Sequence, residues 1–140
     1  MQKIVVGVDG SPASRQALQW AIDEAVRRDA AVIAIHAWEA VLTHAQVRGA
    51  FYHEESGPEL AQAVLEDALA AIDLPEGTSV ERRGVRSDPA RAVIEAAKDA
   101  DLVVVGSRRM GPLGRLVLGS VSTHVVHHAP CPVVVVPAEA

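Results

Sequence analysis

The feature that most constrains the fold is a regular alternation between short apolar runs and longer segments of helical periodicity. Five runs rich in valine and isoleucine read as strands: Ile4–Val8, Ala31–Ala37, Ser79–Val85, Asp101–Val105 and Pro132–Val136. Continuously apolar strands are typical of a sheet that is buried on both faces. The alternation therefore predicts right-handed βαβ units in an α/β fold, with a five-stranded parallel sheet between two helical layers.

Four helices are expected between these strands, and their ends carry recognisable signals. Ser11-Pro12 and Asp88-Pro89 each place a capping side chain before a proline at the first helical position. Gly57-Pro58 opens the second helix, and the fourth is expected over Ser120–Ala129, where Pro130 closes it. Since neither a repeat nor a linker interrupts the pattern, we expect a single domain over residues 1–140.

Composition narrows the class of partner. The net charge is −5, no basic run exceeds two residues, and aromatic residues make up 3%, which together argue against a nucleic-acid partner. The apolar runs are far shorter than the roughly 20 residues of a membrane-spanning helix. Cys131, the single cysteine, is expected to be buried and inert between two prolines. With no signal peptide before the first strand, a cytoplasmic location is expected.

Three strand ends carry polar or glycine-rich segments: Gly7–Ser11, His36–Trp38 and Gly106–Gly111. In an open α/β sheet, ligands bind beyond the carboxyl ends of the strands, at the point where the strand order reverses. These three segments are therefore the candidate site. The 19 residues from Glu39 to Gly57 form a connection long enough to be a lid or a binding segment.

The strongest of these signals follows the fourth strand. Its glycines would let the backbone approach an anion, and Gly119-Ser120 at a helix start adds free amides, the helix dipole and a hydroxyl. Arg108, Arg109 and Arg115 supply charge that can pair with phosphate. The alternative interpretation is a glycine-rich connecting loop with solvated arginines.

Several other side chains allow two interpretations. Asp9 is either a ligand-binding carboxylate or a turn or capping residue. His36 is either a general base or, as we prefer, a strand histidine that is hydrogen-bonded within the core. For the three histidines of the last helix, an exposed position near the helix C-terminus is preferred over a metal site: His124, His127 and His128.

The order of these motifs resembles the universal stress protein family. The resemblance rests on Gly-Val-Asp-Gly-Ser, Ile-His-Ala, Val-Val-Gly-Ser-Arg, Leu-Gly-Ser-Val-Ser and the terminal Ala-Pro-Cys-Pro-Val-Val-Val-Val, and it covers nearly the whole chain. The ATP-binding branch of that family carries Gly-x2-Gly-x9-Gly-Ser/Thr. Gly106 and Gly119-Ser120 match this motif, but Arg109 replaces its middle glycine. Arginine there would either be strained, if the backbone needs a positive φ, or add a phosphate ligand.

The resemblance implies a Rossmann-like sheet of order 3-2-1-4-5 and a nucleotide site at its switch point. Asp9 would contact the ribose or adenine, the backbone of Ala37 the adenine edge, and residues 105–112 the ribose and phosphates. The implied binding residues are Gly7, Val8, Asp9, Ala37, Val105, Gly106, Ser107, Arg108, Arg109, Met110, Gly111, Pro112, Gly119, Ser120 and Val121.

The function implied by the resemblance is that of an ATP-binding regulatory stress protein, with Mg²⁺ as the ion that would accompany ATP and with slow hydrolysis at most. The family's sheet order would make Pro132–Val136 an edge strand, through which we expect a homodimer. Two alternatives stay open. One is a structural homodimer of the branch that binds no nucleotide, to which Arg109 gives weight. The other is a fragment of an ATP-dependent adenylating enzyme, suggested by the Asp9-Gly10-Ser11 loop.

Overall fold

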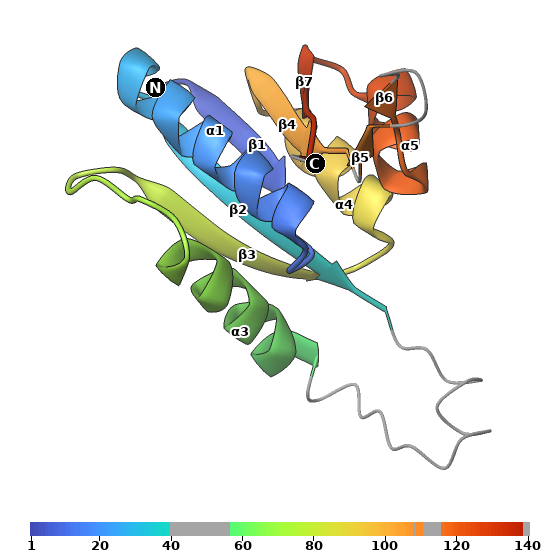
Figure 1. Cartoon of the computed structure of the whole chain (residues 1–140), viewed down its shortest axis with the longest axis horizontal. Coiled ribbons are helices and arrows are strands. Elements are labelled where there is room, and N and C mark those ends of the chain that lie inside the picture. The colour runs from blue at the N-terminus through green and yellow to red at the C-terminus, as the bar shows by residue number, and fades with distance from the viewer. Residues whose placement is uncertain (40–56, 108, 111–115, 139–140) are drawn as a thin grey trace.

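The computed structural model describes residues 1–39, 57–107, 109–110 and 116–138 (Figure 1). Its main sheet consists of five parallel strands: β1 (Lys3–Gly7), β2 (Ala31–Trp38), β3 (Val80–Arg86), β4 (Leu102–Gly106) and β7 (Val133–Val136). They are arranged in the order β3-β2-β1-β4-β7, which confirms the sheet order that the family resemblance implied. The chain leaves β1 toward β2 on one side and returns to β4 on the other, so the switch point lies between β1 and β4.

Helices pack against both faces of this sheet (Figure 1). The described residues contain four: α1 (Pro12–Arg28), α3 (Gly57–Ala70), α4 (Pro89–Ala97) and α5 (Ser120–His128). α1 and α3 bury their apolar faces on one side of the sheet, and α4 and α5 bury theirs on the other. The strands between the two layers are accordingly apolar on both faces, with residues such as Ile4, Val5 and Val104 fully buried.

The expected caps hold the helix starts. The Ser11 side chain accepts a hydrogen bond from the Ser14 amide at 3.2 Å, and Asp88 accepts one from the Arg91 amide at 3.1 Å. Proline follows each cap, where its missing N–H costs nothing. Since parallel strands and their helices alternate in direction, the starts of α1, α4 and α5 all lie at the carboxyl end of the sheet (Figure 1).

A second, two-stranded sheet was not expected from the sequence. β5 (Arg109–Met110) pairs antiparallel with β6 (Leu116–Val117) between β4 and α5, with Arg109 opposite Val117. Two residues per strand are too few for an alternation of apolar and polar side chains to be recognised. The pairing gives the glycine-rich connection a defined start and end.

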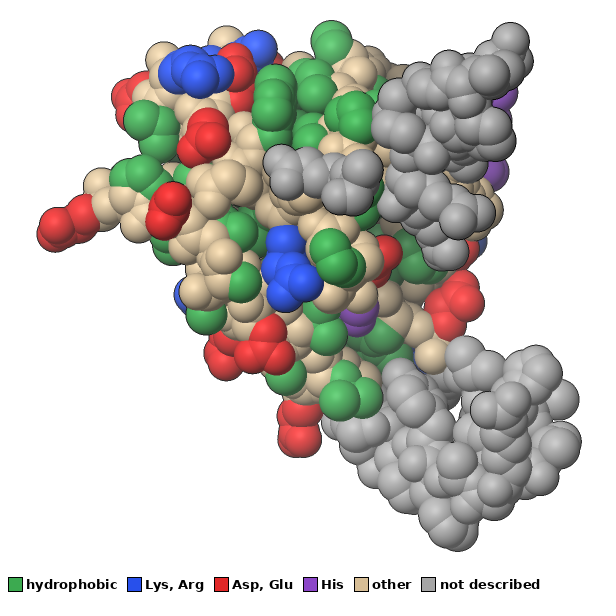
Figure 2. Space-filling view, viewed as in Figure 1, with side chains coloured by type: hydrophobic (Ala, Val, Ile, Leu, Met, Phe, Trp, Pro, Cys, Tyr) green, Lys and Arg blue, Asp and Glu red, His purple; other side chains and the backbone are tan. Residues whose placement is uncertain are grey.

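Two surface properties bear on the class of partner. Figure 2 shows acidic side chains at several places on the described part of one face, in keeping with the net charge of −5. Across the described ranges, the helices all fall short of the length and apolar character needed to cross a bilayer.

Candidate functional site

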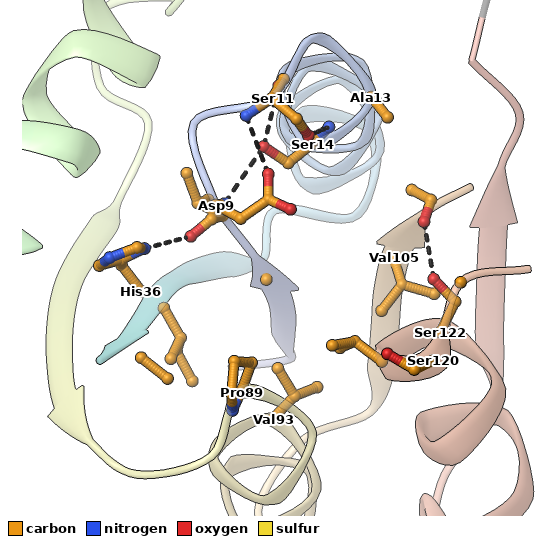
Figure 3. A pocket seen from close by; sticks show the side chains of 17 residues that line it. Asp9, Ser11, Ala13, Ser14, His36, Pro89, Val93, Val105, Ser120 and Ser122 are labelled. Atoms are coloured by element: carbon orange, nitrogen blue, oxygen red, sulfur yellow. Dashed lines mark hydrogen bonds between the residues drawn. The ribbon is translucent and has the colours of Figure 1, made fainter. Parts of the chain in front are cut away.

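A cavity of about 250 Å³ opens at the carboxyl ends of β1, β2 and β4. In Figure 3, Asp9 and His36 lie on one side of it, Ser120 and Val105 on the other, and Pro89 and Val93 of α4 approach from a third. Nine of the residues expected to bind a nucleotide line this cavity: Gly7, Val8, Asp9, Ala37, Val105, Gly106, Gly119, Ser120 and Val121. The structure thus brings together residues 7–9, Ala37 and residues of the last third of the chain, which are far apart in the sequence.

The remaining expected residues lie elsewhere. Ser107 is fully buried and does not line the cavity, and its amide donates to the Val136 carbonyl at 2.9 Å. Arg109 and Met110 form β5. Arg108, Gly111 and Pro112, together with Arg115 and most of the long connection after β2, lie outside the described residues.

The turn from β1 into α1 is held by a small network of hydrogen bonds around Asp9. Asp9 Oδ1 accepts from the Ser11 amide at 2.9 Å, and the Asp9 amide donates to Ser14 Oγ at 3.3 Å. Ser14 Oγ in turn donates to the Ser11 carbonyl at 3.1 Å, while Gly10 turns the chain with a φ of +85°. The turn interpretation of Asp9 is confirmed, because one carboxylate oxygen accepts from the Ser11 amide. The residue also lines the cavity, and its role in binding a ligand stays a prediction.

His36 is hydrogen-bonded as expected. Its Nδ1 lies 2.7 Å from the Val8 carbonyl oxygen, and since a carbonyl can only accept, Nδ1 carries the proton that is donated. The ring is half-buried at the edge of the cavity rather than enclosed in the core. The hydrogen bond that the preferred interpretation expected is present, but the position within the core is wrong, because the ring lies at the edge of the cavity.

The start of α5 forms the opposite side of the cavity. Its N-cap, Gly119, has φ −74° and ψ 176°, an extended backbone, and offers no side-chain hydrogen bond to the first turn. The first turns of α1 and α4, by contrast, are capped by Ser11 and Asp88. The N-cap of α5 has no side chain that could accept from the amides beside the cavity. These amides can therefore donate to an anion, and the helix dipole favours negative charge there.

A further hydrogen bond fixes α5 to the sheet. Ser122 Oγ donates to the Gly106 carbonyl at 2.7 Å, and the Ser122 residue is only 6% exposed. Gly106 also lies against α1, because a Cβ built on it would be 2.6 Å from the Ala13 carbonyl oxygen. The end of β4 is therefore in contact with the starts of two helices, α1 and α5, that line the cavity.

The backbone conformation at Arg109 decides whether arginine is strained at the position of the motif's middle glycine. Arg109 lies in a strand, and an extended backbone accommodates arginine without the strain of a positive φ. Among the described residues other than glycine, positive φ occurs only at Asp29. The departure from the family motif at this position therefore imposes no backbone strain here.

Eight residues that line the cavity were not among the implied binding residues, although two of them, Ser11 and His36, lie in the candidate segments: Ser11, Ala13, Ser14, Ile35, His36, Pro89, Val93 and Ser122. Ser11 and Pro89 were recognised as helix-start residues, and His36 as a hydrogen-bonded histidine. The helix starts were the available signal, because helices that follow strands in a parallel sheet begin at the edge where ligands bind. Nothing in their sequence alone shows which side chains face the cavity.

The remaining chemical candidates lie away from this cavity. His124, His127 and His128 are exposed on α5, and the rings of His124 and His128 lie 4.5 Å apart between centroids. Within the part of the chain that the structure describes, no three His, Cys, Asp or Glu side chains gather as a metal would need. Cys131 is half-buried rather than fully buried, and burial together with the Asp101 charge raises the pKa of its thiol.

The family model of the universal stress protein family matches residues 1–137. This chain belongs to that family. A universal stress protein of Mycolicibacterium smegmatis is 39% identical over 135 residues, which cover 95% of this chain and 45% of that protein. One from Thermus aquaticus is 36% identical over 138 residues, covering 95% of this chain and 96% of the relative. The chain thus spans less than half the length of the mycobacterial relative.

Solved structures of the family share the fold. A universal stress protein in complex with cAMP is 28% identical, with a TM-score of 0.68 over 99% of this chain and 98% of the other. The universal stress protein of Archaeoglobus fulgidus in complex with dAMP is 27% identical, with a TM-score of 0.70 over 96% and 97% of the two chains. Those two proteins bind adenine nucleotides.

Proposed function

We propose that this universal stress protein binds an adenine nucleotide, with ATP as the preferred ligand, in the cavity at the carboxyl ends of β1, β2 and β4. The observation that carries the proposal is the pairing, across one cavity, of an apolar wall with a helix start whose cap has no side chain. A flat base needs an apolar wall to pack against, and a phosphate chain needs the free amides of a helix start. The relatives that bind cAMP and dAMP support the same class of ligand.

The base and ribose belong on the side formed by β1, β2 and α4. Ile35 and Val93 are buried there, and Ala37 and Pro89 complete a surface with few polar side chains. The backbone of Ala37 at the end of β2 would supply the polar edge that an adenine requires, and Asp9 the partner for the ribose. Burial of the base against aliphatic side chains would favour binding at roughly 25 cal/mol per Å² of apolar surface.

The phosphates belong on the α5 side. Gly119, Ser120 and Val121 line the cavity at the start of α5, and the exposed Ser120 adds a hydroxyl donor. Arg109, in the strand that follows β4, is the charge that would distinguish ATP from adenosine. Mg²⁺ would accompany ATP through its phosphate oxygens.

We propose binding rather than rapid turnover as the role of this site. Two polar side chains that line the cavity already make hydrogen bonds to the backbone. Asp9 Oδ1 accepts from the Ser11 amide, and His36 Nδ1 donates to the Val8 carbonyl. Bound nucleotide would then act by favouring one conformation or one partner.

The first test is mass spectrometry of protein denatured directly after purification, with a retained adenine nucleotide expected. Calorimetry with ATP, ADP, cAMP, adenosine and GTP then ranks the ligands. Asp9→Ala and Gly119→Val should each weaken ATP binding, Asp9→Ala by about 5- to 150-fold for one lost polar partner of about 1–3 kcal/mol. Asp99→Ala, an exposed change beyond the other end of α4, is the matched control. Failure of the parent protein to bind any of these ligands would contradict the proposal.

We further propose that the protein forms a homodimer through the strand expected at Pro132–Val136. β7 ends the sheet order, so one of its edges has no partner strand among the described residues. All four of its valines are half-buried against the core clusters, so the strand's free edge is its backbone, and prolines bracket it, which confines pairing to a short register. Such a dimer is also the basis of the second candidate function, a structural protein without nucleotide. The cytoplasmic location and the single domain over residues 1–140 stay predictions.

A further inference from the structure

We propose that His36 is a positioning residue of the nucleotide site, which fixes the direction in which Asp9 leaves the end of β1. The inference rests on the proposed function, since it concerns how the site is held in shape for its ligand. Its evidence is a side-chain hydrogen bond that joins two strand ends 28 residues apart.

His36 holds a carbonyl beyond the last paired residue of β1. The paired register of β1 and β2 ends with Gly7 opposite Ile35, yet the next residue, Val8, is still tied to β2. Its amide donates to the Ile35 carbonyl at 2.8 Å, and its carbonyl accepts from His36 Nδ1 at 2.7 Å. The imidazole thus keeps Val8 bonded to β2. Val8 lies one residue beyond the paired part of β1, where the chain turns away from the sheet.

The group that His36 holds is one half of a rigid unit. The Val8 carbonyl and the Asp9 amide belong to the same planar peptide group, so fixing the oxygen also orients the N–H. That N–H donates to Ser14 Oγ at 3.3 Å, on the first turn of α1. Two side chains, one from β2 and one from α1, therefore hold this peptide group at its two ends, as Figure 3 shows.

The position of Asp9 depends on this peptide group. Its Cα follows directly, and Gly10, with a φ of +85°, has the conformational freedom to let the turn move if the peptide group rotates. The neighbouring hydrogen bond from the Ser11 amide to Asp9 Oδ1 is local to the turn and would move with it. His36 thus adds a side-chain contact to the backbone bond that ties the Asp9 turn to β2, the strand whose end carries Ala37 on the base side of the cavity.

The test compares two nearly isosteric replacements, His36→Asn and His36→Leu. Asparagine places an N–H at the position of Nδ1, counted in bonds from the backbone, whereas leucine has the same branched shape without a donor. We expect His36→Asn to bind ATP within about threefold of the parent and His36→Leu to lose about tenfold, the loss typical of one hydrogen bond.

A second measurement is independent of the nucleotide. Hydrogen exchange of the Asp9 amide, followed by NMR, reports whether the peptide group is still held, and the Val103 amide, which donates to the Pro132 carbonyl, is the internal reference. In His36→Leu the Asp9 amide should exchange about tenfold faster relative to Val103, and in His36→Asn it should not.

These two measurements separate the possible failures. If the parent binds ATP and both variants bind equally well with unchanged exchange at Asp9, the inference about His36 is wrong while the proposed function stands. If the parent binds no nucleotide, the proposed function fails, and the exchange ratio still decides whether His36 positions Asp9. Equal acceleration at Asp9 and Val103 would mean that His36 only stabilises the fold, which also overturns the inference.

Discussion

Replacing Gly106 by alanine tests whether the end of β4 sets the shape of the cavity. A Cβ at this position would lie 2.6 Å from the Ala13 carbonyl oxygen and 2.9 Å from the Ala13 carbonyl carbon. Both atoms are backbone, so the contact can be relieved only if α1 or β4 shifts. Gly7 is the matched control, because it ends the neighbouring strand β1 and its Cβ would meet a single side-chain methyl, Val93 Cγ2, at 3.3 Å.

The expected magnitude follows from two opposing terms. Replacing glycine by alanine stabilises the folded state by about 0.4–1 kcal/mol where the backbone tolerates it, through the unfolded chain. Overpacking against a fixed neighbour costs about 1–3 kcal/mol. We therefore expect Gly106→Ala to lower the free energy of unfolding by about 1–2 kcal/mol, and Gly7→Ala to leave it nearly unchanged.

Urea unfolding followed by circular dichroism measures this difference. With an m-value of about 2 kcal/mol per M, Gly106→Ala should unfold at a midpoint about 0.5–1 M below that of the parent. ATP affinity should fall in the same variant, because the first turn of α1 that carries Ser11 and Ser14 would move. Equal midpoints for the two variants would refute the argument that backbone contact at Ala13 limits this position.

Three further predictions concern other parts of the molecule. Arg109→Ala should lower the ratio of ATP affinity to adenosine affinity, and high salt should lower the same ratio in the parent. Arg27→Ala, at the far end of α1, should leave this ratio unchanged. If Arg109→Gly binds a nucleotide that the parent does not bind, the arginine blocks the site. Val134→Lys should convert a dimer to a monomer in light scattering, and a monomeric parent at micromolar concentration would refute the β7 interface. Because burial and the Asp101 charge raise the pKa of the Cys131 thiol above the usual 9.0, less thiolate is present at pH 8. Alkylation there should be slower than in the unfolded chain, and faster in Asp101→Asn.

The elements of this fold were recognisable from local sequence because their signals are local. A valine-rich run needs only its own residues to predict a buried strand, and Ser11-Pro12 and Asp88-Pro89 contain both the cap and the proline that begin α1 and α4. The same holds for the start of α5 at Ser120, which follows a glycine. Strand order and the expected binding residues came instead from the resemblance to the family. Local sequence signals supply neither of them.

Apart from the two-residue strands β5 and β6, the sequence by itself thus determined which segments become strands and helices, and which ends of them carry glycine, serine and charge. Only the tertiary structure decided how those ends meet. The bond from His36 to the Val8 carbonyl spans 28 residues, that from Ser122 to the Gly106 carbonyl spans 16, and Gly106 lies against Ala13 of a different helix. Each contact depends on the direction of a side chain or a carbonyl after the sheet and its helices have packed. No periodicity encodes that direction, since it arises from packing between elements rather than within any one of them.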